Sequence, residues 1–325
     1  MISRRQFAAT LAAAAASLAA ATARADTYPD RPITMIVPFG PGGGVSINAR
    51  ALAPYLEKQL GQTIIIDNRE GAGGIIGHTM GAFARPDGYT LTMVSPGITA
   101  APWLVPNVRF TPDDYTYIGQ VTFVPNMVVV NADSPWQGVK DLVAAMKADP
   151  GKIATGGISG WPSSTVAQAL FLKAADVTAK VVPGFKGGAD MISAVLGKHI
   201  DFGFVNLNEA MPLYEAHRIR ILAVSAPARA AALPDVPTFR EQGIDVTTGV
   251  WRSLAAPKGT PQPIIDRLSA ALKAALADPA LKQDFDKVEL SVDYLDAEET
   301  RKRVLAEYQA FGRLFTELHM NVRKS

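Results

Sequence analysis

Short apolar runs alternate with amphipathic stretches along most of the chain. From residue 31 onward, β-rich runs such as "ITMIV", "TIIID" and "YTLTMVS" are separated by segments whose apolar residues recur at spacings of three and four. The first of these segments spans about residues 46–60, and a shorter one spans about residues 76–84. This alternation is typical of parallel α/β units, in which helices connect the strands of one sheet.

A second series of the same kind begins at "MVVVN", residues 127–131. A helical pattern follows "SPWQG", and the apolar runs "KIATGG", "AKVVP", "IDFGFVN" and "IRILAVSA" then alternate with further helical patterns. Two series separated by a different stretch predict two α/β lobes, each a mostly parallel sheet flanked by helices.

The end of the chain predicts helices without strands. After the loop-like segment "LPDVPTFREQGID", two long amphipathic patterns follow, "PIIDRLSAALKAAL" and "AEETRKRVLAEYQAFGRLFTEL". Because these helices follow the second lobe and have no strands of their own to cover, we expect them to pack on the first. Residues 28–127 and 249–325 are therefore expected to form lobe 1, and residues 128–248 lobe 2.

The first 25 residues have the pattern of an export signal. A basic start precedes an alanine-rich stretch, and Ala23-Arg24-Ala25 provides an A-x-A site for cleavage after Ala25. The stretch is shorter than the roughly 20 apolar residues that span a membrane, which disfavours an anchor. "SRRQF" matches the twin-arginine pattern, and general secretory signals also carry paired arginines, so both export routes stay open. The predicted location is the bacterial periplasm.

Charge and cysteine content narrow the function. Removal of Arg4, Arg5 and Arg24 with the signal leaves 29 basic and 30 acidic side chains, a formal net charge of −1. A neutral chain without dense basic runs is not expected to bind nucleic acid. The chain has no cysteine, so it has neither disulfides nor thiolates to use as metal ligands or nucleophiles.

Four glycine-rich turns each join a strand to a helix. They are "GPGGGVS", "REGAGGIIG", "GGISGWPSS" and "GFKGGAD". Glycines let the backbone approach a ligand closely, and the amide groups at a helix N-terminus attract anions. Each turn alone is also compatible with a tight connection between strand and helix, but two from each lobe at matching sheet ends predict a ligand site.

Other chemistries are poorly supported by the residues. The first turn lacks the lysine of a P-loop, and Gly71, Gly73 and Gly77 have the wrong spacing for a dinucleotide fingerprint. His78, His199, His217 and His319 form no metal-binding motif, and no serine stands in a nucleophile elbow. Trp161 and Trp251 are expected to pack, with ligand contact as the alternative. We therefore predict no cofactor, no metal and no enzymatic activity.

Several segments, taken together, resemble one family. "YPDRPITMIVPFGPGGG", "DNREGAGGIIG", "RPDGYTL", "LPDVPTFREQG" and "WRSLAAPKGTP" are similar, in order and spacing, to the periplasmic solute-binding proteins of tripartite tricarboxylate transporters, the Bug family. The resemblance implies a two-lobed Venus-flytrap protein that closes on a small carboxylate. It also implies delivery to the large and small membrane subunits of a transporter, by a receptor expected to be monomeric.

The same resemblance implies a set of binding residues. In that family, facing turns of the two lobes hold one carboxylate through backbone amides, hydroxyls and bridging water. Carried over by position, the ligand-binding residues of this chain would be Phe39, Gly40, Gly43, Ser46, Ser95, Thr99, Ser163, Ser164, Thr165, Phe185, Asn206 and Asn208.

Departures from the family pattern leave the ligand open. Val45 and Ser46 stand where many relatives have Thr and Asp, and Thr165 stands where they have His. Loss of the acid disfavours an amino-acid ligand, because an ammonium group would lose its partner. Aromatic, short aliphatic, dicarboxylic and tricarboxylic acids all remain candidates. A periplasmic hydrolase, or a partner that presents ligand to a sensor protein, is the alternative function.

Overall fold

A computed structural model describes residues 28–158, 163–185, 187–230, 232–288, 290–318 and 320. The predicted export signal and Trp161 lie outside these residues. The chain divides into two compact units: unit 1 runs to Val121 and takes in Arg252–Val288 and the segment from Val292, whereas unit 2 comprises Thr122–Trp251 and residues 289–291. Within the described ranges, no helix has the length and apolar character needed to cross a membrane.

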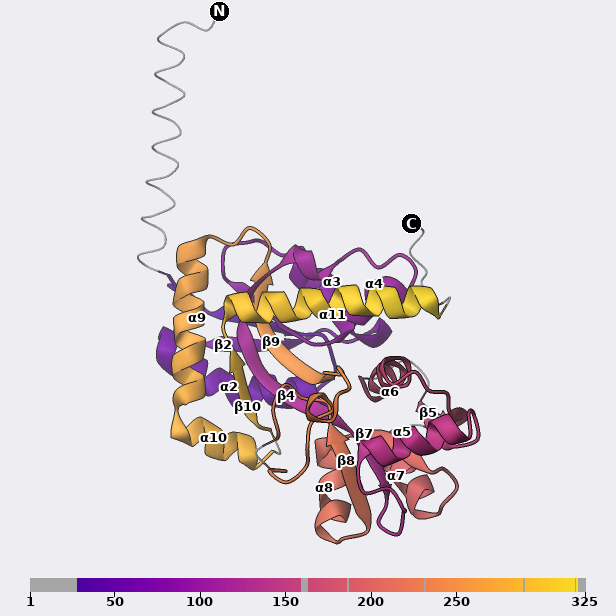
Figure 1. Ribbon diagram of the computed structural model, residues 1–325. Coiled ribbons are helices and arrows are strands. Elements are labelled where there is room, and N and C mark those ends of the chain that lie inside the picture. Colours follow the sequence, from indigo (N-terminus) through magenta and orange to yellow (C-terminus); the bar gives the residue numbers. More distant parts are fainter. Residues whose placement is uncertain are drawn as a thin grey trace, which may run out of the picture. The chain divides into compact units, whose positions relative to one another are not determined.

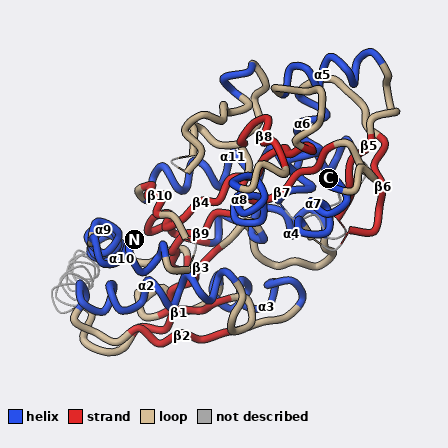
Figure 2. The backbone as a smooth tube through the Cα atoms, turned by 90° about the horizontal axis from the view of Figure 1, so that it is seen from below, coloured by secondary structure: helices blue, strands red, loops and turns tan. Residues whose placement is uncertain are grey.

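Unit 1 contains a sheet that is parallel at its centre. Strand β1 (Ile33–Val37) pairs in parallel with β2 (Ile64–Asn68) on one side and with β3 (Thr90–Val94) on the other. Figure 2 shows these three strands running side by side. Strand β9 (Gly249–Pro257) adds to β3 in the antiparallel direction, so the sheet is mixed.

Helix α2 follows β1 and is held by the C-terminal helices. Its apolar positions recur at spacings of three and four, which buries one face of the helix. Helices α9 and α10 pack against α2, and the Tyr55 hydroxyl of α2 donates to Asp284 Oδ2 of α10 at 2.6 Å. The helices of this unit include α2 (Gly44–Leu60), η1 (Ala72–Gly74), α3 (Ile75–Ala82), α4 (Gly97–Leu104), η2 (Pro112–Asp114), α9 (Gln262–Ala277), α10 (Pro279–Asp286) and α11 (Ala297–Glu317).

The C-terminal segment differs from the sequence expectation in one respect. It was expected to carry helices alone, but β9 precedes α9, and β10 (Val292–Leu295) lies between α10 and α11 and pairs with β4 (Tyr115–Asn131). The long helix α11, yellow in Figure 1, packs along α4. There Trp103 Nε1 donates to the carbonyl of Tyr308 at 3.0 Å, across 205 residues of sequence. The expectation was wrong about strands because β10 is short and only partly buried.

Unit 2 has a second mixed sheet. Strand β5 (Ala154–Ile158) pairs in parallel with β6 (Lys180–Phe185) and β7 (Phe202–Asn206), while β4 runs antiparallel to β7 and β8 (Ile219–Val224). Strand β4 begins well before the run "MVVVN" that predicted it. The remaining elements of this unit are α5 (Val139–Ala148), α6 (Ser163–Ala174), α7 (Gly188–Leu196), α8 (Leu207–Glu215) and η3 (Arg240–Gln242).

Aromatic rings fill the core of unit 2. Phe171 of α6 lies 5.5 Å from Phe204 and 5.6 Å from Phe239, between ring centroids, and the rings of Phe204 and Phe239 are stacked. All three side chains are fully buried. Because Phe239 belongs to the "LPDVPTFREQG" segment, the loop is anchored in the core that the strands and α6 build.

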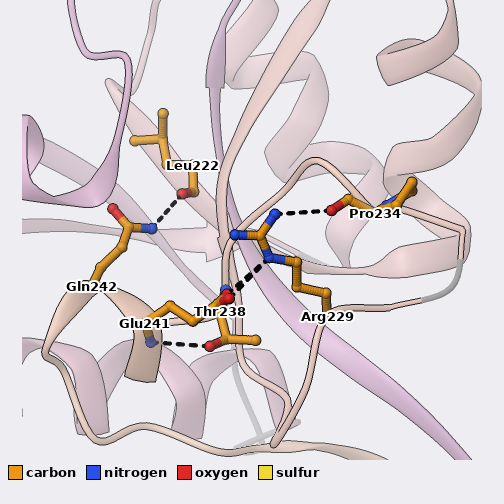
Figure 3. Close-up of polar contacts among 6 residues, drawn as sticks. All are labelled: Leu222, Arg229, Pro234, Thr238, Glu241 and Gln242. Carbon is orange, nitrogen blue, oxygen red and sulfur yellow. Dashed lines mark hydrogen bonds and ion pairs between the residues drawn. The ribbon is translucent and has the colours of Figure 1, made fainter.

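Polar contacts fix the same segment to β8 (Figure 3). Glu241 accepts from the Thr238 amide at 2.6 Å and from Arg229 Nε at 3.0 Å, and its own amide donates to Thr238 Oγ1. The Thr238 amide is the main reason why the pKa of Glu241 is lowered. Gln242 Nε2 donates to the carbonyl of Leu222 in β8 at 2.9 Å. This part of the family resemblance therefore has a structural role in the fold.

His78 of α3 is buried in unit 1 beside aromatic rings. Its ring lies 5.7 Å from that of Phe110 and 6.3 Å from that of Phe39. Among the described residues, neither ring nitrogen has a hydrogen-bond partner. Burial lowers the pKa of His78 to about 3, so the imidazole is neutral in the folded protein.

The neutral state of His78 predicts a pH-dependent stability. In the unfolded chain this histidine is protonated below about pH 6.5, whereas in the folded protein it is protonated only below about pH 3. Between these two pH values the unfolded chain therefore binds one more proton than the folded protein. The contribution of His78 to the free energy of unfolding should therefore be fully present above about pH 6.5. Below that pH it should fall by up to about 1.4 kcal/mol per pH unit. Urea unfolding from pH 7.5 to 5 should show a shallower fall for His78→Gln than for the parent. The exposed His199→Gln should follow the parent, and identical slopes for all three would contradict the prediction.

Gly77 of α3 predicts a second effect on stability. A Cβ at this position would lie 2.6 Å from the carbonyl oxygen of Arg69 and 2.6 Å from Cα of Pro38, both backbone atoms. Gly77→Ala should therefore lower the free energy of unfolding by about 1–3 kcal/mol, as overpacking does. Gly97→Ala is the matched control, since a Cβ there meets its neighbours only at 3.5 Å or more. Equal stability of the two variants in urea would show that α3 shifts to make room.

Candidate functional site

The turn before α2 presents backbone amide groups. Gly42 has a left-handed φ of 87°, and the Gly43 amide donates to the carbonyl of Gly40 at 3.2 Å. Gly43 itself is extended, with φ −70° and ψ 152°, and the helix begins at Gly44. The first turn of α2 contains no acidic residue, and Gly42, Gly43 and Gly44 are exposed. The helix therefore begins at an exposed residue, while Val45 and Ser46 of the same turn are buried. Amides in the first turn of a helix have no partner within it and favour an anion.

Asn68 supports this turn from β2. Its Nδ2 donates to the carbonyl of Phe39 at 2.7 Å and to Ser46 Oγ at 3.1 Å, and Arg50 Nη2 donates to its Oδ1 at 3.0 Å. Ser46 is fully buried. Its hydroxyl thus lies beneath the turn and accepts from Asn68. Sequence analysis missed Asn68, although its place at the carboxyl end of β2 is where α/β sheets carry functional residues.

Two further predicted residues follow β3. Ser95 comes directly after the strand and is 5% exposed. Thr99 is fully buried in α4, where its hydroxyl contacts the carbonyl of Pro96 and Glu307 Oε1, both at 2.7 Å. Thr99 therefore links α4 to α11, whereas Ser95 stands at the end of the strand beside β9.

Arg252 of β9 is a residue that sequence analysis did not select. The pairing of Val94 with Ser253 puts Arg252 at the level of Ser95, one residue beyond the last paired positions. Its Nη2 lies 2.7 Å from where a Cβ on Gly44 would be, so the guanidinium reaches the first residue of α2. Its side chain is buried, and the burial lowers the pKa of Arg252 to about 10. Among the described residues, its Nε and Nη1 have no hydrogen-bond partner.

In unit 2, Asn126 connects the predicted site residues Ser163 and Asn206 through hydrogen bonds. Asn126 of β4 is fully buried, and its Nδ2 donates to Ser163 Oγ at 3.1 Å and to Asn206 Oδ1 at 2.9 Å. The Asn206 amide donates to Glu209 Oε2 at 2.8 Å, which forms the capping box of α8. Ser163 begins α6 and Asn206 ends β7, so Asn126 brings a helix start and a strand end together.

The other predicted residues of unit 2 lie around this group on separate elements. Ser164 is buried and Thr165 half-buried in the first turn of α6. Phe185 ends β6, and its ring lies against Gly156 of β5. Asn208 is exposed on α8. Trp251, expected to pack, is fully buried.

The chemistry of these groups is that of anion binding. These groups are backbone amides, hydroxyls, side-chain amides and the guanidinium groups of Arg50 and Arg252, all of which can donate hydrogen bonds. Across the described residues, no three His, Asp or Glu side chains gather closely enough to hold a metal ion. A carboxylate would find donors on either unit.

Comparison with known proteins agrees with the resemblance. Residues 48–320 match the model of the "Tripartite tricarboxylate transporter family receptor". A Pseudomonas protein from the tcbD-tcbE intergenic region is 34% identical over 291 residues, 87% of this chain and 86% of that protein. Protein BugT of Bordetella pertussis is 33% identical over 82% of either chain.

Solved structures show the same two-lobed fold. A TctC solute-binding protein from Polaromonas is 29% identical and superposes with a TM-score of 0.85, covering 90% of this chain and all of that one. Rpa4515 of R. palustris, solved with adipate, has 28% identity and a TM-score of 0.67 over 89% and 97% of the chains.

MatC of Rhodopseudomonas palustris, solved with bound malate, has 27% identity and a TM-score of 0.65 over 88% and 99% of the chains. The two-lobed periplasmic-binding-protein fold predicted from the sequence is confirmed. So is the resemblance drawn from the sequence segments. Since one family model spans most of the chain and several relatives exceed 30% identity, this protein belongs to the tripartite tricarboxylate transporter receptor family, the TctC or Bug family of solute-binding proteins.

Proposed function

We propose that this protein captures a small organic carboxylate in the periplasm and delivers it to the membrane subunits of a tripartite tricarboxylate-type transporter. The observation that carries the proposal is the start of α2, where the glycines of the turn are exposed and the first helical turn has no acidic side chain. Relatives solved with adipate and malate support a carboxylate as the ligand class. The export signal predicted over residues 1–25 supports the compartment.

The α2 turn suits a carboxylate for physical reasons. The first four amides of a helix have no partner within it, and the helix dipole adds roughly half a positive charge at that end. Phe39 and Gly40 are half-buried, which shields the turn on one side, while Gly43 and Gly44 are exposed. A carboxylate placed here would accept backbone hydrogen bonds without displacing any side chain of the first turn.

Binding without catalysis is part of the proposal. A hydrolase needs a nucleophile activated by a base within hydrogen-bond reach. His78, the histidine described in unit 1, is neutral, and neither of its nitrogens contacts a described hydroxyl. In unit 2, Ser163 is hydrogen-bonded to Asn126, whose amide cannot take up a proton.

The experiment is a thermal-shift screen of the mature protein against mono-, di-, tri- and aromatic carboxylates, each beside its neutral amide. A ligand at 100 times its Kd should stabilise the native state by about 2.7 kcal/mol, and the amide should not. NMR of the ligand after incubation should show it unchanged. Stabilisation by no carboxylate, or conversion of the ligand, would overturn the proposal.

Delivery needs its own measurement. Uptake of the bound carboxylate into vesicles carrying the purified large and small membrane subunits should depend on this protein. Uptake at the same rate without it would overturn the transport role and leave the binding role intact. Signalling through a sensor protein would then be the next function to test.

Asn126 generates a prediction for the second unit. Asn126→Ala removes the two bonds that hold Ser163 and Asn206 together, so affinity for the carboxylate found in the screen should fall about 10-fold. The matched control is Asn131→Ala on the same strand, which loses bonds to the end of α7 but not to Ser163. Calorimetric titration of both variants tests the difference. Equal affinities would show that the Asn126 group only stabilises unit 2.

A further inference from the structure

Arg252 combines burial with unused hydrogen-bonding capacity. The side chain belongs to β9 and is 9% exposed. Its Nε and Nη1 are inaccessible and have no hydrogen-bond partner among the described residues. Buried guanidinium groups are ordinarily paired, because an ionised group taken out of water without a partner is strongly unfavourable.

Arg303 of α11 shows what a paired arginine in the same unit looks like. Its Nη1 donates to Gln120 Oε1 at 2.5 Å and lies 4.0 Å from Asp293 Oδ2. The charges of Glu307 and Asp293 favour its ionised form. For Arg252, burial is the one influence on the pKa, and no acid of the described chain offsets it.

The surroundings of Arg252 make its charge less favourable still. The guanidinium reaches Gly44, the first residue of α2, where the helix dipole is positive. The guanidinium and the positive end of the helix dipole therefore lie close together, and the first turn of α2 contains no acidic residue that would offset their charge. Glu70 lies close to the same turn, with its Oε2 beside Gly40, yet it forms no ion pair with Arg252 within the described residues.

We propose that Arg252 binds the ligand's carboxylate directly, together with the amide groups at the start of α2. The inference rests on the proposed function and deepens it, because the site would carry a fixed positive charge in addition to the neutral donors that the family resemblance implies. An anion held between the guanidinium and the helix start would satisfy both. The contact would be made through Nη2, the nitrogen that lies at Gly44, and a charged donor of this kind forms a strong hydrogen bond to a carboxylate.

The ligand class follows from this charge. The site should require an ionised carboxylate and reject the neutral amide or ester of the same acid, since either would leave the guanidinium unpaired. A charge-assisted hydrogen bond contributes about 1.5–3 kcal/mol, so loss of the guanidinium should weaken binding by roughly 10- to 150-fold.

The test compares Arg252→Met with the parent, with and without ligand. Methionine replaces an unpaired buried cation by an apolar side chain, so the ligand-free variant should melt at a higher temperature than the ligand-free parent. With the carboxylate found in the screen, the variant should show the 10- to 150-fold loss of affinity and a smaller thermal shift. Arg252→Lys keeps the charge but loses the planar guanidinium, so it should bind with intermediate affinity.

Arg303→Gln is the matched control in the same unit. It removes a guanidinium that has partners, so its melting temperature should fall while its affinity for the carboxylate stays that of the parent. A fall in melting temperature for ligand-free Arg252→Met, with unchanged affinity, would overturn the inference and make Arg252 a structural residue.

Sulfate and chloride form the last arm of the test. If a carboxylate binds the parent and Arg252→Met equally, the proposed function stands and the role of Arg252 fails. If no carboxylate binds, but sulfate stabilises the parent and not Arg252→Met, the anion site stands and the proposed function fails. Stabilisation of neither protein by any anion overturns both.

Discussion

The start of α2 combines the positive end of a helix dipole with the buried Arg252 guanidinium, and no acid in the first turn of the helix offsets this charge. A helix that begins at glycine, with no acid in its first turn, leaves its amides without internal partners. The turn is nevertheless held firmly, because Asn68 ties the carbonyl of Phe39 to the hydroxyl of Ser46 from below. These contacts use the Phe39 carbonyl and the Ser46 hydroxyl and none of the backbone amides of the first helical turn. Rigidity and an unused binding capacity thus occur in the same few residues.

One segment of the family signature serves the fold rather than the candidate site. The residues of the "LPDVPTFREQG" segment have defined structural roles. Phe239 packs in the core, Thr238 and Glu241 hydrogen-bond to each other, and Gln242 donates to a carbonyl of β8. None of these contacts depends on which ligand is bound. A chain can therefore keep this segment of the signature while residues at the start of α2, such as Val45 and Ser46, differ between relatives.

The sequence predicted those parts of the structure that local pattern determines. Apolar periodicity located β1, α2, β3 and α9, because each buries one face or one short run. It underestimated β4 and missed β9 and β10, whose strand character depends on pairing with distant partners. The candidate site divides in the same way. The glycine turn was visible as a motif, whereas Asn68, Asn126 and Arg252 become noteworthy only through the residues that folding brings beside them.

The discontinuity of unit 1 has a consequence for the order in which the molecule is made. The paired residues of β9, Ser253–Ala255, and helices α9 and α11 contact β3, α2 and α4, yet the ribosome completes Thr122–Trp251 before it reaches them. Unit 2 is nearly continuous and can assemble as soon as it has been synthesised. Unit 1 must hold its first strands unfinished until the chain is almost complete, and contacts of such long range fold slowly. The edge of β3 that pairs with β9 stays open until β9 has been synthesised, so in that period a chaperone would protect this edge usefully.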